Sequence, residues 1–156
     1  MIHIVHIIPT LRFGGAERFV VDLVNKSDSA EFRYTIIVFF ADTPLAVELN
    51  PATSIKIIPK HGQISWHLFG DLRLVLHELR PDIVHTHLFG GDLWGRVAAH
   101  QLGIPVVTTE HNINVDESFL KTFVKKCLRE RTTRYVAVSE AIKNYMQQVY
   151  HITWPI

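Results

Sequence analysis

The stretch PTLRFGGAER, residues 9–18, most constrains what this chain can fold into. It follows an apolar run, Ile2–Ile8, and precedes the helical pattern FVVDLV. A strand, a turn containing Gly14-Gly15 and a helix form a unit in which the free amides of the first helical turn can bind an anion. A tight turn without a ligand explains the two glycines equally well, so both interpretations stay open.

The composition indicates one ordinary folded domain. The 156 residues are 47% hydrophobic and 20% charged, which excludes disorder and allows a substantial core. The formal net charge is +1, so nothing in the balance requires a nucleic acid as partner. Cys127 is the single cysteine, so no internal disulfide forms and a reducing compartment fits. With no signal-like leader and no apolar run of roughly 20 residues, we expect a cytoplasmic protein, with peripheral attachment to the inner face of the membrane left open.

Six β-rich runs alternate with helical patterns along the chain. The expected strands are Ile2–Ile8, Tyr34–Phe40, Ile55–Ile58, Asp82–His87, Pro105–Thr109 and Tyr135–Val138. Helices are expected after Gly15, from Thr43-Pro44 to about Leu49, over Asp71–Leu79, from an Asp92 cap to Gly103, over Glu117–Arg131, and from a Ser139 cap to Val149. The segment His61–Gly70 is expected to be a loop. This alternation predicts an α/β fold, a Rossmann-like doubly wound parallel sheet of about six or seven strands spanning residues 1–156 as a single domain.

Several histidines fall at expected strand ends, where ligands bind in such sheets. His85 and His87 lie two apart and therefore share a face of their strand, a spacing that suits a metal pair with His111 as third ligand. No cysteine, HExxH helix or clear acidic partner accompanies them, so we expect no metal. We expect instead that His85 is buried with a backbone partner and that His87 lines a pocket.

His111 is the sharper candidate, because it follows a strand ending in Thr108-Thr109 and begins the polar segment after it. A histidine there could contact substrate hydroxyls or stabilise a developing charge, and a purely structural role weighs equally. The chain has no G-x-S-x-G, no P-loop and no G-x-G-x-x-G pattern, which disfavours serine hydrolases, simple kinases and dehydrogenases.

The expected helix over 117–131 has an apolar stripe surrounded by basic residues. Leu120, Phe123, Val124, Cys127 and Leu128 form the stripe, and Lys121, Lys125, Lys126 and Arg129 lie around it. The favoured interpretation is a helix that faces the core with a solvated basic side. Contact with an anionic membrane surface or an anionic acceptor is the alternative.

Four motifs taken in order resemble the N-terminal domain of family 4 glycosyltransferases, which are retaining enzymes of the GT-B fold. They are HIIP at 6–9 with GGAE at 14–17, RPDIVHTH at 80–87, VTTEH at 107–111 and VAVSE at 136–140. The resemblance implies two Rossmann-like domains across a cleft. The N-terminal domain would bind a glycan or lipid-linked acceptor, as in polysaccharide biosynthesis, and the other domain most of the nucleotide-sugar donor.

The resemblance also implies roles for individual residues. The backbone at Gly14 and Gly15 would approach the donor diphosphate, and His111 would be the catalytic residue beside the transferred sugar. No metal or other cofactor is implied, because loop amides and basic side chains stabilise the leaving diphosphate. Six further residues are expected to line the cleft on the acceptor side: Arg12, Phe13, His87, Asp92, Glu110 and Ser139. Acceptor choice is expected in the segments Gln63–Phe69 and Asn112–Ser118.

The chain ends at Ile156, about where such enzymes pass into the donor-binding domain. We therefore expect a truncated domain or a half-enzyme that transfers no sugar alone, and an apolar patch through which homodimers could form. Two alternatives remain: half of a GT-B nucleotide-sugar 2-epimerase, whose signature acidic and histidine residues are not evident, and a non-catalytic module that binds a sugar or an anion.

Overall fold

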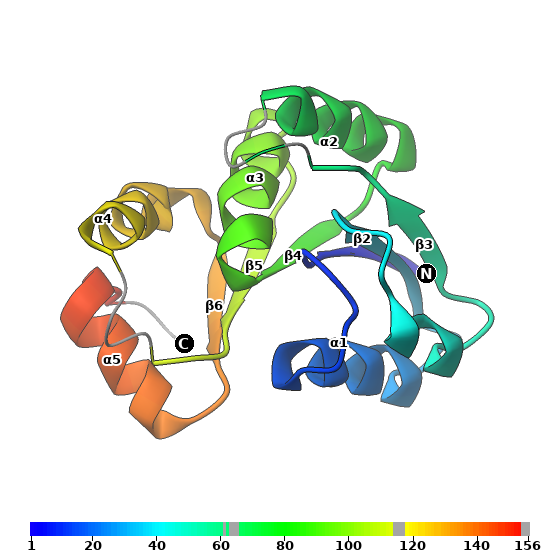
Figure 1. Cartoon of the computed structure of the whole chain (residues 1–156), viewed down its shortest axis with the longest axis horizontal. Coiled ribbons are helices and arrows are strands. Elements are labelled where there is room, and N and C mark those ends of the chain that lie inside the picture. Colours follow the sequence, from blue (N-terminus) through cyan, green and yellow to red (C-terminus); the bar gives the residue numbers. More distant parts are fainter. Residues whose placement is uncertain (61, 63–65, 114–117, 154–156) are drawn as a thin grey trace.

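Six parallel strands form one sheet in the order β3-β2-β1-β4-β5-β6 (Figure 1). The structure is a computed structural model that describes residues 1–60, 62, 66–113 and 118–153. The strands are β1 (Ile2–Ile7), β2 (Phe32–Val38), β3 (Ser54–Ile57), β4 (Ile83–His87), β5 (Val106–Glu110) and β6 (Arg134–Ala137). This order is the one typical of Rossmann-type sheets, and it confirms the predicted doubly wound α/β fold.

Helices cover both faces of the sheet, with α1 (Gly15–Lys26) on one side and α2 (Trp66–Leu79) and α3 (Leu88–Gln101) on the other (Figure 1). Each face has its own core. Val20, Val21 and Val24 of α1 pack with Ile36 and Val38, and on the other face Leu68, Leu72 and Leu76 of α2 pack with Val5 and Ile7. The sequence located all six strands within two residues, because each is a short run with β-branched or aromatic residues.

Glycines bring α3 close to the sheet. A Cβ at Gly91 would lie 2.5 Å from the carbonyl oxygen of Ile7, and one at Gly95 would lie 2.7 Å from Cγ2 of Thr86. A larger side chain would push the helix away from β1 and β4. The sequence predicted Asp92 as the cap of this helix, and that prediction is wrong because the helix begins at Leu88. Asp92 lies inside, where it accepts a 2.8 Å hydrogen bond from the Thr86 hydroxyl and pairs with Arg96 at 3.2 Å.

The boundaries of other elements differ from those predicted from the sequence. Residues 66–70 belong to α2, so the predicted loop over 61–70 is wrong there, while 61 and 63–65 lie outside the described residues. The short helix after Thr43 is a 3-10 helix, η1 (Pro44–Glu48), and η2 (Arg129–Arg131) is a second one. Helix α5 (Glu140–Tyr150) has Ser139 as its N-cap, as predicted, with the hydroxyl accepting from the amide of Ile142 at 3.3 Å.

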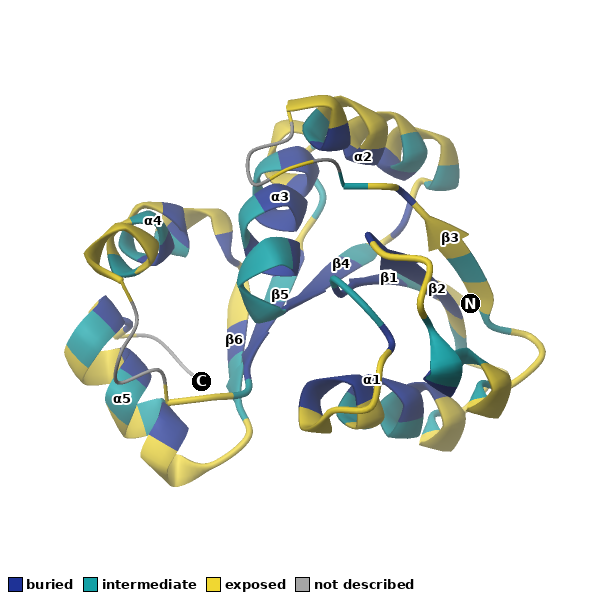
Figure 2. Ribbon diagram, in the orientation of Figure 1, coloured by how far each residue is buried: buried dark blue, intermediate teal, exposed yellow. Residues whose placement is uncertain are grey.

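Helix α4 (Phe119–Leu128) turns only part of the predicted apolar stripe inward (Figure 2). Its buried residues are Lys125 and Leu128, while Phe119, Leu120 and Phe123 are 86%, 69% and 53% exposed. Lys125 is held inside because its ammonium group donates to Glu110 at 2.9 Å and to the Tyr150 hydroxyl at 3.0 Å. The predicted core-facing stripe is therefore wrong for Leu120, Phe123 and Cys127, which are exposed, and holds for Leu128. Among the described helices, none is long and apolar enough to cross a membrane.

Candidate functional site

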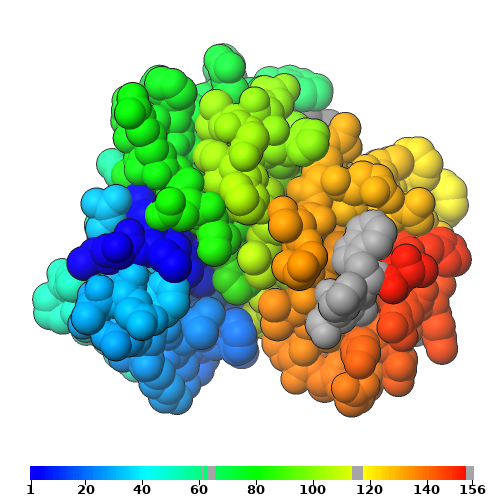
Figure 3. All heavy atoms as spheres, turned by 180° about the vertical axis from the view of Figure 1, so that it is seen from behind, coloured from blue at the N-terminus to red at the C-terminus, as the bar shows by residue number. Residues whose placement is uncertain are grey.

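The candidate site lies at the carboxyl ends of β1 and β4, the point where the strand order reverses. The chain leaves β1 toward one face and β4 toward the other, so the two connections diverge. A hollow of about 430 Å³ opens there, lined by Gly15, Ala16, Glu17, Phe19, Leu88, His111, Asn112 and Val138. In Figure 3 a notch separates the blue segment that contains α1 from the orange segment around residues 130–140.

Backbone dihedrals do not explain the glycines at positions 14 and 15. In the described chain the glycines with positive φ are Gly62 and Gly103, so neither residue of this pair is required by its backbone dihedrals. A Cβ at Gly15 would meet no atom within 4 Å, whereas one at Gly14 would collide with the carboxylate of Glu17. A ligand therefore has open access to the backbone at Gly15 and meets a negative charge at Gly14.

Leu88 marks the start of α3 with an unusual backbone. Its φ of 59° lies in the left-handed region, where a leucine is strained by roughly 1–2 kcal/mol. The residue lines the hollow directly after His87. Strain of this kind is often stored next to functional sites.

Three histidines form a hydrogen-bonded row that ends in the hollow. Nδ1 of His6 lies 3.0 Å from Nε2 of His87, and Nδ1 of His87 lies 3.1 Å from Nε2 of His111. His6 and His87 are buried, and His111 is half-buried at the open end. The rings of Phe19 and His111 pack in a T-shaped arrangement, with 5.3 Å between ring centroids. His6 was not identified as a site residue from the sequence. Pairing of β1 with its parallel neighbour β4, which places His6 beside His85, is the signal that could have identified it.

The predicted surroundings of two histidines are wrong. Nε2 of His85 pairs with the side-chain hydroxyl of Thr109 at 2.7 Å, not with a backbone group. His87 is fully buried behind His111 and does not line the hollow. Ligand nitrogens of His6, His85 and His87 all lie within 4.8 Å of one another, so these rings are the cluster closest to a metal-binding arrangement in the described part of the chain. Two of those rings already hydrogen-bond each other.

Burial keeps the histidines of this row neutral. Loss of solvent lowers the pKa of His6 and of His87 well below 6.5, and neighbouring imidazoles lower both further. Burial lowers the pKa of His85 to about 4. The pKa of His111 is also lowered by burial, and the Asp92 carboxylate partly opposes that shift. Neutral imidazoles each carry one donor and one acceptor, which suits a hydrogen-bonded row.

The other expected cleft residues are dispersed around the site. Arg12 pairs with Asp42 at 2.7 Å on the surface, and Phe13 is 79% exposed. Asp92 and Glu110 are buried in ion pairs with Arg96 and Lys125.

Ser139 holds the start of α5, next to the hollow residue Val138. Of the expected acceptor segments, 114–117 and 63–65 lie outside the described residues. Glu17, Phe19 and Leu88 are lining residues that the sequence did not single out as site residues.

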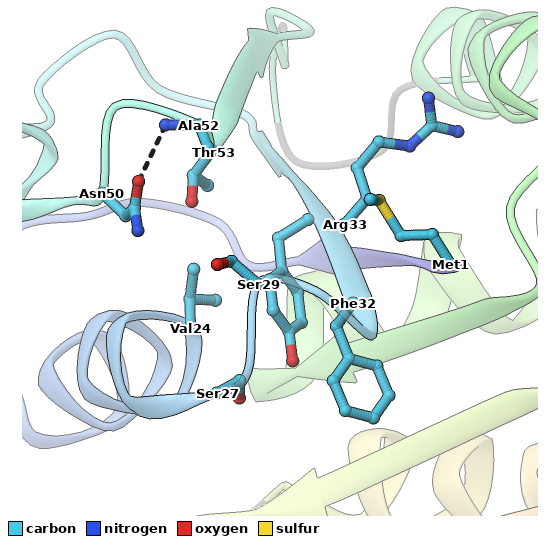
Figure 4. A pocket seen from close by; sticks show the side chains of 10 residues that line it. Met1, Val24, Ser27, Ser29, Phe32, Arg33, Asn50, Ala52 and Thr53 are labelled. Carbon is cyan, nitrogen blue, oxygen red and sulfur yellow. Dashed lines mark hydrogen bonds between the residues drawn. The ribbon is translucent and has the colours of Figure 1, made fainter.

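A second hollow, of about 220 Å³, lies at the opposite, amino-terminal edge of the sheet (Figure 4). Met1, Ser27, Phe32, Arg33 and Thr53 are among its lining residues. Because ligands of parallel α/β sheets bind beyond the carboxyl ends of the strands, this hollow is on the other edge from the candidate site.

Comparisons with known proteins agree with this architecture. The family model described as Glycosyltransferase Family 4 matches residues 13–156. The structure of Anabaena Alr3699/HepE in complex with UDP and glucose superposes with a TM-score of 0.78 at 19% identity, over 96% of this chain and 41% of the other. A glycosyltransferase from Rickettsia africae gives 0.75 at 18% identity, over 97% and 40%.

UDP-N-acetylglucosamine 2-epimerase from Rickettsia bellii gives a TM-score of 0.63 at 13% identity, over 95% of this chain and 42% of the other. The chain thus spans about two fifths of the length of these solved structures. No curated protein matches the chain.

The buried histidines predict a loss of stability in mild acid. In the unfolded chain they titrate near 6.5, while burial depresses the folded-state pKa values, so the unfolded state binds more protons as the pH falls. The free energy of unfolding should fall from about pH 7 downward by roughly 1.4 kcal/mol per pH unit for each histidine that stays neutral. For His85 this loss should end near its folded pKa of about 4. Urea unfolding at several pH values measures the slope. His85→Asn should flatten it relative to the exposed control His77→Asn, and equal slopes would contradict the interpretation.

Proposed function

The chain belongs to glycosyltransferase family 4, and from that premise we propose that it is the acceptor-binding N-terminal half of a retaining hexosyltransferase. The reaction would be attack of an acceptor hydroxyl on the anomeric carbon of a nucleotide sugar, with the nucleotide diphosphate leaving. The acceptor would be a glycan or a lipid-linked glycan. The domain would span residues 1–156, and a second Rossmann-like domain would bind most of the donor.

One observation carries this proposal. The open backbone at Gly15 and the ring of His111 face the same hollow at the switch point of the sheet. Amides at the start of α1 would meet the donor diphosphate, and His111 would stand beside the transferred sugar. Three similar structures are complexes with UDP, with UDP and glucose, and with UDP-glucose, which supports a nucleotide sugar as the donor class.

The proposal includes no metal ion or other cofactor. Diphosphate charge would be stabilised by the α1 amides together with basic side chains of the donor-binding half. Chelation with EDTA should therefore leave transfer by a complete enzyme unchanged.

The 156-residue chain alone should transfer no measurable sugar, because it supplies one wall of the active site. The assay incubates the purified chain with UDP-glucose, other nucleotide sugars and candidate acceptors, and follows diphosphate release. Turnover clearly above a heat-denatured control would overturn the acceptor-half assignment.

Gly15→Ala tests the diphosphate contact without disturbing the fold. Its methyl group would enter open space, so stability should hold, while a ligand seated on the Gly15 backbone should lose roughly tenfold in affinity, about 1.4 kcal/mol. Titration with UDP and UDP-glucose, followed by chemical-shift changes, measures this. Gly70→Ala on α2 is the matched control, since its added methyl also meets nothing within 4 Å and lies in a helix away from the hollow.

The same titrations separate the alternatives. Acceptor binding with weak nucleotide binding supports the transferase half. Tight nucleotide binding without acceptor binding would favour a donor-side role such as half of an epimerase, whose fold is similar. Binding of free sugar or phosphate alone would favour a non-catalytic module. Equal nucleotide affinity in Gly15→Ala and Gly70→Ala would exclude Gly15 from the diphosphate site.

Helix α4 is proposed as the contact with an anionic membrane surface. Phe119, Leu120 and Phe123 project outward, and Lys121 and Lys126 belong to the same helix. An apolar ridge beside lysines suits the interface of a bilayer that carries negative lipids, where a lipid-linked acceptor would be found. The same ridge is the exposed apolar patch through which a homodimer could form.

Replacing the three ridge residues with serine should abolish binding to vesicles that contain phosphatidylglycerol, and added salt should weaken binding of the unmodified chain. Cosedimentation measures both effects. Val47→Ser, at an equally exposed apolar position on η1, is the control and should bind like the unmodified chain. If sedimentation equilibrium shows that the unmodified chain is a dimer and the serine variant a monomer, the ridge would be assigned to self-association instead.

A further inference from the structure

The row His6–His87–His111 holds His111 through hydrogen bonds that run back into the core. His87 is fully buried and both of its ring nitrogens are engaged, one with each neighbour. Because burial keeps all three rings neutral, His87 has a single N–H and must donate to one neighbour and accept from the other. The two hydrogen bonds of the row can therefore run in only two ways. Either both donate inward, toward His6, or both donate outward, toward His111.

These two directions of donation differ in whether Nε2 of His6, at the inner end of the row, carries a proton. Nε2 of His6 is buried and finds no hydrogen-bond partner among the described residues. If the row donates inward, this nitrogen carries a proton with no acceptor, and a buried orphan donor costs about 1–3 kcal/mol. If the row donates outward, the nitrogen keeps only a lone pair. Unpaired N–H donors are the rarer case in proteins, which favours the outward direction.

We propose that His6 and His87 are positioning residues that fix His111 as the Nδ1–H tautomer, with that N–H available to a substrate oxygen. In this arrangement Nδ1–H of His6 donates to Nε2 of His87, and Nδ1–H of His87 donates to Nε2 of His111. The second nitrogen of His111 then carries the proton at the end of the row that borders the hollow.

The consequence is chemical. His111 serves as a hydrogen-bond donor to a hydroxyl or to an oxygen that gains negative charge, and not as the base that removes a proton through Nδ1. The Phe19 ring packed against His111 restricts the orientation of the imidazole in the same way. This inference rests on the proposed role of His111, but its spectroscopic part needs no substrate.

The decisive measurement is the tautomer of each ring. Long-range proton–nitrogen spectra of the 156-residue chain labelled with ¹⁵N-histidine, recorded near pH 7.5, distinguish protonated from bare ring nitrogens. We expect a protonated Nδ1 and a bare Nε2 in His111. A protonated Nε2 there would overturn the proposal directly. A zinc titration that shifts the signals of His6, His85 and His87 together would also overturn it, because a metal would then occupy the lone pairs of the row.

Two variants of His87 separate positioning from packing. His87→Phe keeps a ring but removes both nitrogens, so the His111 signals should move toward the Nε2–H form that free histidine favours in water. His87→Gln has a donor and an acceptor on one amide and should restore the Nδ1–H form. An unchanged tautomer in His87→Phe would contradict the proposal. His6→Phe removes the donor at the inner end of the row and should also shift His111 toward the Nε2–H form. This variant tests the positioning role if His87→Phe fails to fold.

His3→Asn is the matched control. His3 is a buried histidine on the same strand, but it pairs with Thr35 and Arg33 at the other end of β1. This variant should leave the His111 tautomer unchanged. In titrations with UDP-glucose and candidate acceptors, His87→Phe should lose about tenfold in affinity and His87→Gln should recover it. If the tautomers behave as expected but no sugar ligand binds, the hydrogen-bonded row stands and the proposed function fails.

Discussion

The hydrogen bonding of β1 on both edges is the constraint on which the rest of the structure depends. The strand pairs with β2 and with β4, and the α3 backbone lies against it at Gly91. Its continuation is anchored as well, because the carbonyl of Pro9 accepts from the amides of Phe39 and Phe40 and that of Leu11 accepts from Leu45. The loop before Gly14-Gly15 is thereby held in place before any ligand arrives, which reduces the entropy cost of binding.

The sheet could be predicted from the sequence because its strands are short runs rich in β-branched and aromatic residues that alternate with helical patterns. The starts of α1 and α5 could be predicted too, but that of α3 could not, since it depends on contacts made after folding. Asp92 looks like a cap in the sequence, yet Arg96 one turn later and Thr86 on β4 draw its carboxylate inside. Lys125 makes the same point: an ion pair with Glu110 and a bond to Tyr150 bury a lysine that periodicity places on the solvated side.

The histidines show where prediction of the site stopped. Alternation put His85 and His87 on one face, and the end of β5 put His111 near them, so their proximity followed from the sequence. How deeply each histidine is buried could not be predicted from the sequence, because burial depends on how α1 and the ring of Phe19 cover that face of the sheet. Whether a ring nitrogen meets a hydroxyl, as in His85, or another imidazole, as in His87, is decided by side-chain directions that no residue pattern encodes.

The charges around the glycine loop bear on how a diphosphate could be held. The described residues that line the hollow include no lysine or arginine, and Glu17 contributes a carboxylate. Two arginines of the glycine loop and of α1 are already engaged, Arg12 with Asp42 and Arg18 with Glu48. Exposed pairs of this kind are weak and can be exchanged for a stronger anion. Until such an exchange, the positive potential on this side of the hollow comes mainly from the amides at the start of α1. A helix terminus offers about half an elementary positive charge, whereas a diphosphate carries two or more negative charges. Stable donor binding by this site therefore requires basic groups that approach the open side of Gly15 from across the hollow.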